Sequence, residues 1–233
     1  MRTRFFDYKM ILIYILIISC FLTVPLVGNR TVTAFSEASI EHKYVVIDAG
    51  HGGVDGGAVS CTGTYESQIN LEIALKLNDL MHLLGIRIVM IRDTDRSVYT
   101  EGETIAAKKV SDIKERLRIV NTTPNALFLS IHQNNFQDSR YSGTQVFYND
   151  QPDSKLLAGQ LQASFRENIN PANKRQIKKS SGVYLMEHIN CTGVLIECGF
   201  LSNHHEESLL QNPDYQRKIC AVIAATVSQY LNT

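Results

Sequence analysis

The sequence predicts a single α/β domain in which a mostly parallel central sheet is flanked by helices on both faces. Short continuous apolar runs, such as Tyr44–Ile47 and Ala126–Ile131, are typical of strands buried on both faces of a parallel sheet. Segments with apolar residues at helical spacing lie between these runs, and the alternation indicates an α/β layered domain. The 233 residues, less an N-terminal segment with the character of targeting sequence, fit one medium domain with a sizeable core.

The first predicted unit is a strand, a glycine-rich loop and a helix. Tyr44–Ile47 forms the strand, and the loop follows it at Gly50–Gly57. We expect Thr64 to cap the start of the helix and Gly85 to end it. The apolar residues that recur at helical spacing in this helix are Ile69, Ile73, Leu77, Leu80 and Leu84.

The same alternation continues through the rest of the chain. The sequence predicts a strand at Ile86–Ile91, a helix at Asp112–Val120, a strand at Ala126–Ile131, short strands at Gly143–Tyr148 and Gly182–Leu185, a helix at Leu156–Phe165, a buried strand at Gly193–Glu197 and a final helix opened by Pro213. In the final helix one face is formed by Ile219, Val222, Ile223, Thr226 and Tyr230.

Two charged segments interrupt this pattern, Asp93–Ser111 and Asn173–Ser180. Their ordinary interpretation is as solvated loops. The alternative is that they rim a substrate groove and contact an anionic glycan, and both interpretations stay open at this point.

The N-terminal segment predicts export from the cytoplasm. Met10–Val27 is an uncharged apolar run that follows three basic residues, which favour a cytoplasmic N-terminus. We interpret residues 1–30 as a signal anchor or signal peptide, residues 31–43 as a polar linker, and residues 44–233 as the folded domain. A membrane-bound protein is the first interpretation; cleavage after Ala34 and lipidation at Cys20 are the alternatives.

Charge and cysteine content exclude two classes of function. Lysine plus arginine equals aspartate plus glutamate at 23 each, so the long-range attraction typical of nucleic-acid binders is missing and no nucleic-acid partner is expected. No C-x-x-C pair exists, so zinc-finger chemistry is not indicated. We interpret as structural the cysteines beyond the N-terminal segment, which are Cys61, Cys191, Cys198 and Cys220.

Three polar residues stand at or just after the ends of predicted strands: His51, His132 and Glu197. Because ligands gather at the carboxyl ends of the strands in open α/β sheets, these side chains can converge although they are distant in sequence. Catalytic zinc sites use three ligands from histidine and carboxylate and leave the fourth position for water. From spacing alone, the third ligand could be Asp55, Glu66 or Glu197.

The glycine-rich loop invites comparison with nucleotide-binding loops. The lysine and hydroxyl residue of a P-loop are absent, and GHGGVDGG does not reproduce the spacing G-x-G-x-x-G that leads directly into a helix. Lone glycine clusters are weak signals, so the sequence does not favour nucleotide binding.

Taken together, the motifs resemble the zinc-dependent N-acetylmuramoyl-L-alanine amidases, the Amidase_3 family, from Tyr44 to Leu231. In this order they are VVIDAGHGGVDGGA, Glu66 followed by Asn70-Leu71, Arg92, Arg116 five residues before Asn121, SIHQN at Ser130–Asn134 and IECGFLSN at Ile196–Asn203. Family members commonly have proline at Ala49, leucine at Gln133 and an aliphatic residue at Cys198. None of these departures removes a predicted ligand.

The resemblance implies roles for individual residues. His51, Glu66 and His132 would bind one Zn²⁺ ion, and Glu197 would be the catalytic carboxylate. Asn134 and Arg116 are candidates for contacts to the substrate or to the ligands, with a structural hydrogen bond as the alternative for each.

The implied activity is hydrolysis of the amide bond between the lactyl group of N-acetylmuramic acid and L-alanine in peptidoglycan, on the extracytoplasmic face of the membrane or in the wall. The segments TEGETIAAKKVSDIKERLRIVN and YSGTQVFYN resemble the germination-specific, spore-cortex members of the family. Targeting or activation would then fall to a partner protein. The alternatives are a zinc peptidase or deacetylase acting on another wall amide, and a wall-binding regulator without catalysis.

Overall fold

The computed structural model describes residues 43–232, so the predicted N-terminal anchor and nearly all of the linker lie outside the described residues. The strands are β1 (Tyr44–Ala49), β2 (Arg87–Met90), β3 (Ala126–Asn134), β4 (Gln145–Tyr148), β5 (Lys178–Lys179) and β6 (Thr192–Phe200). The helices are α2 (Glu66–Leu83), α3 (Ile105–Thr122), α4 (Ser154–Asn168), α5 (Tyr184–His188), α6 (His204–Leu210) and α7 (Pro213–Leu231).

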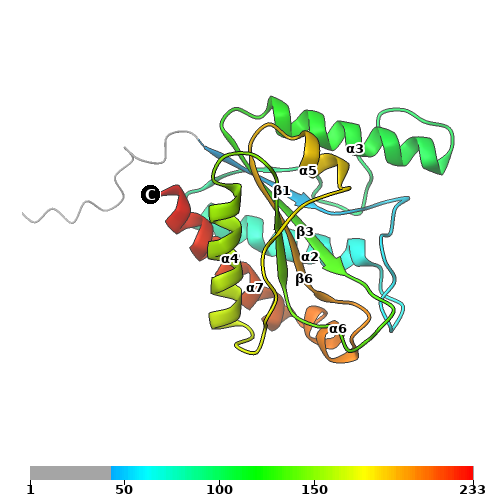
Figure 1. The fold of residues 1–233 in the computed structure, drawn as a ribbon. Coiled ribbons are helices and arrows are strands. Elements are labelled where there is room, and N and C mark those ends of the chain that lie inside the picture. The colour runs from blue at the N-terminus through cyan, green and yellow to red at the C-terminus, as the bar shows by residue number, and fades with distance from the viewer. Residues whose placement is uncertain (1–42, 233) are drawn as a thin grey trace, which may run out of the picture. The chain divides into compact units, whose positions relative to one another are not determined.

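The strands form one six-stranded sheet in the order β2-β1-β3-β6-β4-β5, and only the pairing of β4 with β6 is antiparallel. Helices α2, α4 and α7 cover one face, and α3 and α5 cover the other (Figure 1). The predicted fold class, a mostly parallel sheet between two helical layers, is therefore confirmed. Because β1, β3 and β6 run parallel, their carboxyl ends meet at one edge of the sheet.

The apolar periodicities explain which faces are buried. The predicted faces of α2 and α7 pack against each other and against the sheet, and Ile73, Leu77, Ile219 and Ile223 are fully buried there. On the other face a smaller cluster forms around Phe128, Leu185 and Leu195 beneath α3 and α5. No helix between residues 43 and 232 combines the length and the hydropathy that a membrane span requires.

Three local predictions are wrong. Gly182–Leu185 is not a strand, because Gly182 adopts a positive φ and the chain then turns into α5 at Tyr184. Thr64 does not cap α2, since the N-cap position is Tyr65 and has no side-chain cap.

The third error is the start of α3, which begins at Ile105, inside the segment expected to be a loop. There Thr104 accepts a hydrogen bond from the Ala107 N–H. This first turn is exposed on most sides, so it lacks the apolar periodicity that would have revealed it.

Candidate metal centre and active site

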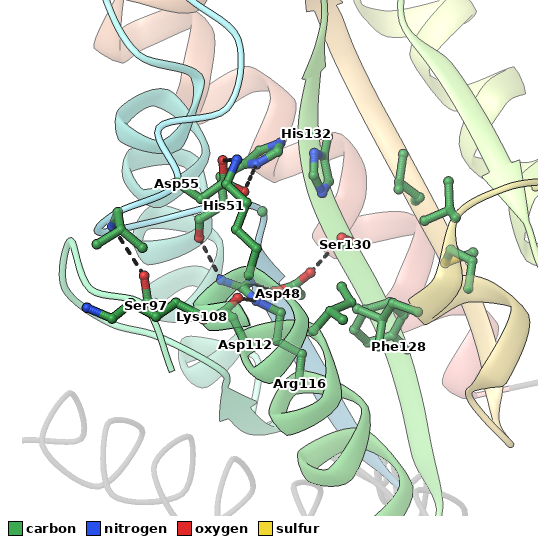
Figure 2. Close-up of a pocket in the computed structure, with 18 of the residues that line it drawn as sticks. Asp48, His51, Asp55, Ser97, Lys108, Asp112, Arg116, Phe128, Ser130 and His132 are labelled. Carbon is green, nitrogen blue, oxygen red and sulfur yellow. Dashed lines mark hydrogen bonds and ion pairs between the residues drawn. The ribbon is translucent and has the colours of Figure 1, made fainter. Parts of the chain in front are cut away.

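The structure brings together His51, Glu66 and His132, one from each of three elements. His51 follows β1, Glu66 is the first residue of α2, and His132 lies near the end of β3. One potential ligand atom from each lies within 4.8 Å of the others. Figure 2 shows His51 and Asp55, from the loop after β1, beside His132 on its strand. This is the group of three that could hold a metal ion among the residues that the structure describes.

Glu66 lies at the centre of this group and is 4% exposed. Its Oε2 is 3.2 Å from His51 Nε2, and its Oε1 is 2.9 Å from His132 Nδ1. The backbone N–H groups of Ala58 and Gln133 also donate to this carboxylate. Burial alone would raise the pKa of Glu66, but hydrogen bonds and charge from the two histidines hold it far below its usual range. The two imidazoles therefore favour the charged form of the Glu66 carboxylate between them.

His51 is held in an unusual backbone conformation, with φ at 61°. The left-handed region costs a non-glycine residue on the order of 1–3 kcal/mol, so the surrounding contacts must hold it there. One of these contacts is the hydrogen bond that Arg116 Nη2 donates to the His51 carbonyl at 2.7 Å. Burial lowers the pKa of His51, but Glu66 and Asp55 raise it to about 9.

Asp55 selects which His51 nitrogen faces the cluster. Asp55 Oδ2 lies 2.8 Å from His51 Nδ1, which leaves Nε2 toward Glu66. Asp55 is therefore placed behind the imidazole and not among the potential ligands, although spacing alone left it a candidate. A carboxylate in this position fixes the tautomer and orientation of a ligating histidine.

Two glycines allow the three side chains to approach one another. A Cβ at Gly50 would lie 2.3 Å from the His132 ring, and a Cβ at Gly57 would lie 2.7 Å from Glu66 Oε2. Gly57 also has a positive φ. The glycine-rich loop therefore serves close packing around the cluster.

Glu197 lies directly across the β3–β6 pairing from His132. Its Oε2 is sealed from solvent and has no hydrogen-bond partner within residues 43–232. Burial and the negative charge of Glu66 raise the pKa of Glu197 to about 7, against the opposing charge of the histidines. A carboxylate with a pKa near neutrality and a free oxygen is suited to exchange protons with a bound molecule.

Arg116 and Asn134 occupy different surroundings. Arg116 is buried; it forms ion pairs with Asp48 and Asp112, and it donates to the carbonyls of Ala49 and His51. It supports the loop that carries His51. Asn134 ends β3 and does not line the cavity beside the cluster.

A cavity of about 300 Å³ opens beside the cluster, between the sheet and helices α3 and α5. His51, His132 and Glu197 contribute to its wall. Figure 2 shows Lys108 and Arg116, which come from α3, on one side and Phe128 on the other. The predicted catalytic carboxylate and two predicted ligands therefore face a common space large enough for part of a substrate.

Two contributions to the site were not predicted from the sequence, the hydrogen bond between His51 Nδ1 and the carboxylate of Asp55 and the ion pair between Lys109 and Asp55 at 2.7 Å. Lys109 lies in the segment expected to be a loop. The i,i+4 spacing of His51 and Asp55 was visible in the sequence, but only the turn geometry brings the two side chains together.

Comparison with known proteins gives one consistent result. The sequence profile of the family described as N-acetylmuramoyl-L-alanine amidase, Amidase_3, matches residues 45–229. The germination-specific N-acetylmuramoyl-L-alanine amidase of Bacillus subtilis (strain 168) is 34% identical over 190 residues, which cover 81% of this chain and 79% of that protein.

Solved structures agree with the sequence relatives. The CwlD amidase from Clostridioides difficile, solved in complex with the GerS lipoprotein, superposes with a TM-score of 0.78 at 39% identity and covers 81% of this chain and 98% of that one. An N-acetylmuramoyl-L-alanine amidase from Clostridium difficile 630 superposes with a TM-score of 0.72 at 28% identity, covering 82% and 97%.

Proposed function

The chain belongs to the N-acetylmuramoyl-L-alanine amidase family, Amidase_3, and we propose that it cleaves the amide bond between N-acetylmuramic acid and L-alanine in peptidoglycan. In this proposal His51, Glu66 and His132 hold one zinc ion, and Glu197 is the catalytic carboxylate. The observation that supports this most is the convergence of two imidazoles and a buried carboxylate beside a second carboxylate that has a free oxygen. Residues 44–233 form the catalytic domain in this proposal.

The donor set fits zinc. Two histidines and one glutamate are a known ligand combination of catalytic zinc sites, which keep a position open for water. Glu66 is ionised, and its hydrogen bonds from backbone N–H groups hold the carboxylate in place. Burying a charged carboxylate beside two imidazoles costs free energy, and a bound cation offsets this cost.

When bound, zinc would lower the pKa of a water molecule and polarise the lactyl carbonyl of the substrate. Glu197, which lines the cavity, then accepts the proton from the attacking water. The same residue returns the proton to the departing amine of L-alanine, so the glycan keeps a free lactyl carboxylate. His51 and His132 hold their orientation through Asp55, Glu66 and the adjacent backbone, and Arg116 fixes the His51 loop.

The cellular role follows from the relatives. The relative from Bacillus subtilis is named germination-specific, and the Clostridioides difficile amidase was solved with a lipoprotein. These names support our proposal that this chain acts outside the cytoplasm on the wall or spore cortex and has a protein partner for targeting or activation. We also propose that the N-terminal segment attaches it to the membrane.

Product analysis tests the activity. Purified protein supplied with zinc should release peptides with a new alanine amino terminus from peptidoglycan and leave the glycan intact. A chelator should abolish this release, and added zinc should restore it. Release of acetate, or of an internal stem-peptide fragment, would indicate a deacetylase or peptidase instead. Binding to the wall without any product would indicate a non-catalytic regulator.

Replacing Asp55 with asparagine should weaken zinc binding about 10–100-fold, because the hydrogen bond that orients His51 loses its charge. Competition with a chromogenic chelator measures the affinity. The same change at Asp150, an exposed residue paired with Lys179, should leave the affinity unchanged. Equal affinities for the Asp55→Asn variant and the unmodified protein would contradict the orienting role.

A further inference from the structure

The wall that α3 contributes to the cavity carries two lysines, Lys108 and Lys109. Lys109 Nζ lies 2.7 Å from Asp55 Oδ1, and the other oxygen of Asp55 lies 2.8 Å from His51 Nδ1. The Lys109 ammonium is therefore two hydrogen bonds away from a predicted zinc ligand. Its side chain is 50% exposed, so part of it stays accessible.

The aspartates that line the cavity each have a basic partner on α3, whereas Glu197, also on the cavity wall, has none among the described residues. Asp48 and Asp112 both pair with Arg116, and Asp55 pairs with Lys109. Lys108 has no carboxylate within ion-pair distance in the part of the chain that the structure describes, and its ammonium lies 5.1 Å from the centre of the Tyr99 ring. A cation over an aromatic ring keeps N–H groups free for an anion.

The position of this wall relative to the reacting centre is fixed by the fold. Arg116, two turns further along α3, donates to the backbone on both sides of Gly50. Ser97, in the segment that leads from β2 to α3, donates to the Gly52 carbonyl at 2.8 Å. The helix that carries the lysines is therefore tied directly to the loop that carries His51.

Part of the cavity wall is apolar. Figure 2 shows Phe128 across the cavity from Lys108. Phe128, Val183 and Leu195 all line the cavity and offer no side-chain donor to an anion. A substrate with a negative charge near its scissile bond therefore has one favourable orientation, with that charge toward α3.

We propose that Lys108 and Lys109 form a subsite for the free carboxylate of the stem-peptide residue that follows alanine, which rests on the amidase function proposed above. A γ-linked glutamate at that position leaves its α-carboxylate free. Two residues span at most roughly 7 Å, so this carboxylate stays close to the scissile amide. The lysines line the same cavity as His51, His132 and Glu197. Where the same carboxylate is amidated, the substrate has no charge for the subsite to recognise.

Two muramoyl peptides test the subsite, identical except for a carboxylate or a carboxamide on the second residue. With Lys108→Met, kcat/KM for the carboxylate substrate should fall about tenfold while the carboxamide substrate changes less than about twofold. In the double variant Lys108→Met/Lys109→Met, which also removes the ion pair to Asp55, the carboxylate substrate should lose more than the carboxamide substrate. Lys114→Met, on the same helix but lining a different hollow, is the matched control and should leave both values unchanged.

The outcomes separate the possible failures. An equal loss on both substrates would overturn the subsite, because the lysines would then act only through Asp55 and His51. No loss on either would overturn it as well. A lower zinc affinity or a lower thermal midpoint would show that the double variant is misfolded. In that case the single variant Lys108→Met, which removes no contact to Asp55, decides whether the subsite exists. If the unmodified protein releases a peptide with an alanine amino terminus from neither substrate, the amidase function itself fails.

Discussion

Replacing Glu197 with glutamine is expected to lower kcat about 10²–10⁴-fold while zinc stays bound. Glutamine keeps the size of the side chain but cannot accept a proton from water at neutral pH. The three predicted ligands are separate residues, so the zinc content should remain at one ion per chain. Stability should not fall, because Glu197 Oε2 makes no hydrogen bond with the described residues that the substitution could break.

The measurement is the rate of appearance of alanine amino termini, with zinc determined on the same sample. Glu167→Gln, the same change at an exposed position on α4, is the matched control. Retained activity in Glu197→Gln would contradict the role of proton acceptor. Loss of zinc from this variant would instead place Glu197 among the ligands.

Replacing Arg116 with methionine is expected to destabilise the protein by about 3–5 kcal/mol, because Asp48 would be left as a buried charge without a charged partner, with only the Ser130 hydroxyl donating to it. The change also removes the hydrogen bonds to the carbonyls of Ala49 and His51. Urea denaturation measures the free energy of unfolding. Arg118→Met, at an exposed pair with Glu115 on the same helix, should give no measurable change.

The pH dependence gives the Arg116 prediction a second test. Burial opposes ionisation of Asp48, but the Arg116 guanidinium, together with His132 and the Ser130 hydroxyl, outweighs burial and holds the pKa of this carboxyl below its ordinary value. The pair therefore stabilises the fold above the unfolded pKa of about 4, and this stability is lost as pH falls through the lower folded value. Without Arg116, burial raises the pKa of Asp48. Lowering the pH then protonates the buried carboxyl in the folded variant and so increases the variant's free energy of unfolding. The difference in free energy of unfolding between the unmodified protein and the Arg116→Met variant should therefore become smaller as pH falls. A difference that does not change with pH would contradict the explanation that Asp48 is left as an unpaired charge.

The sequence was sufficient to predict the parts of the site that depend on strand direction. His51, His132 and Glu197 follow or end apolar runs, and parallel pairing brings such ends together. Glu66 could not be chosen over Asp55 from spacing, because both lie near His51 in the chain and the geometry of the intervening turn decides which nitrogen each one meets.

The α3 side of the site was the least predictable part. The first turn of α3 is exposed, and its lysines have no periodic signal that separates them from a solvated loop. Their position depends on long-range contacts, such as those from Arg116 and Ser97 to the His51 loop. Short elements like α5 are also set by packing, since one turn of helix has little propensity of its own.

Anomalous scattering at the zinc absorption edge, from crystals of the zinc-loaded protein, tests the metal centre most directly. The predicted result is one peak within about 2.0–2.2 Å of a nitrogen of His51, a nitrogen of His132 and a carboxylate oxygen of Glu66, with Glu197 beyond bonding distance. A peak bonded to Glu197 or Asp55 in place of Glu66, or the absence of a peak between the two histidines, would contradict it.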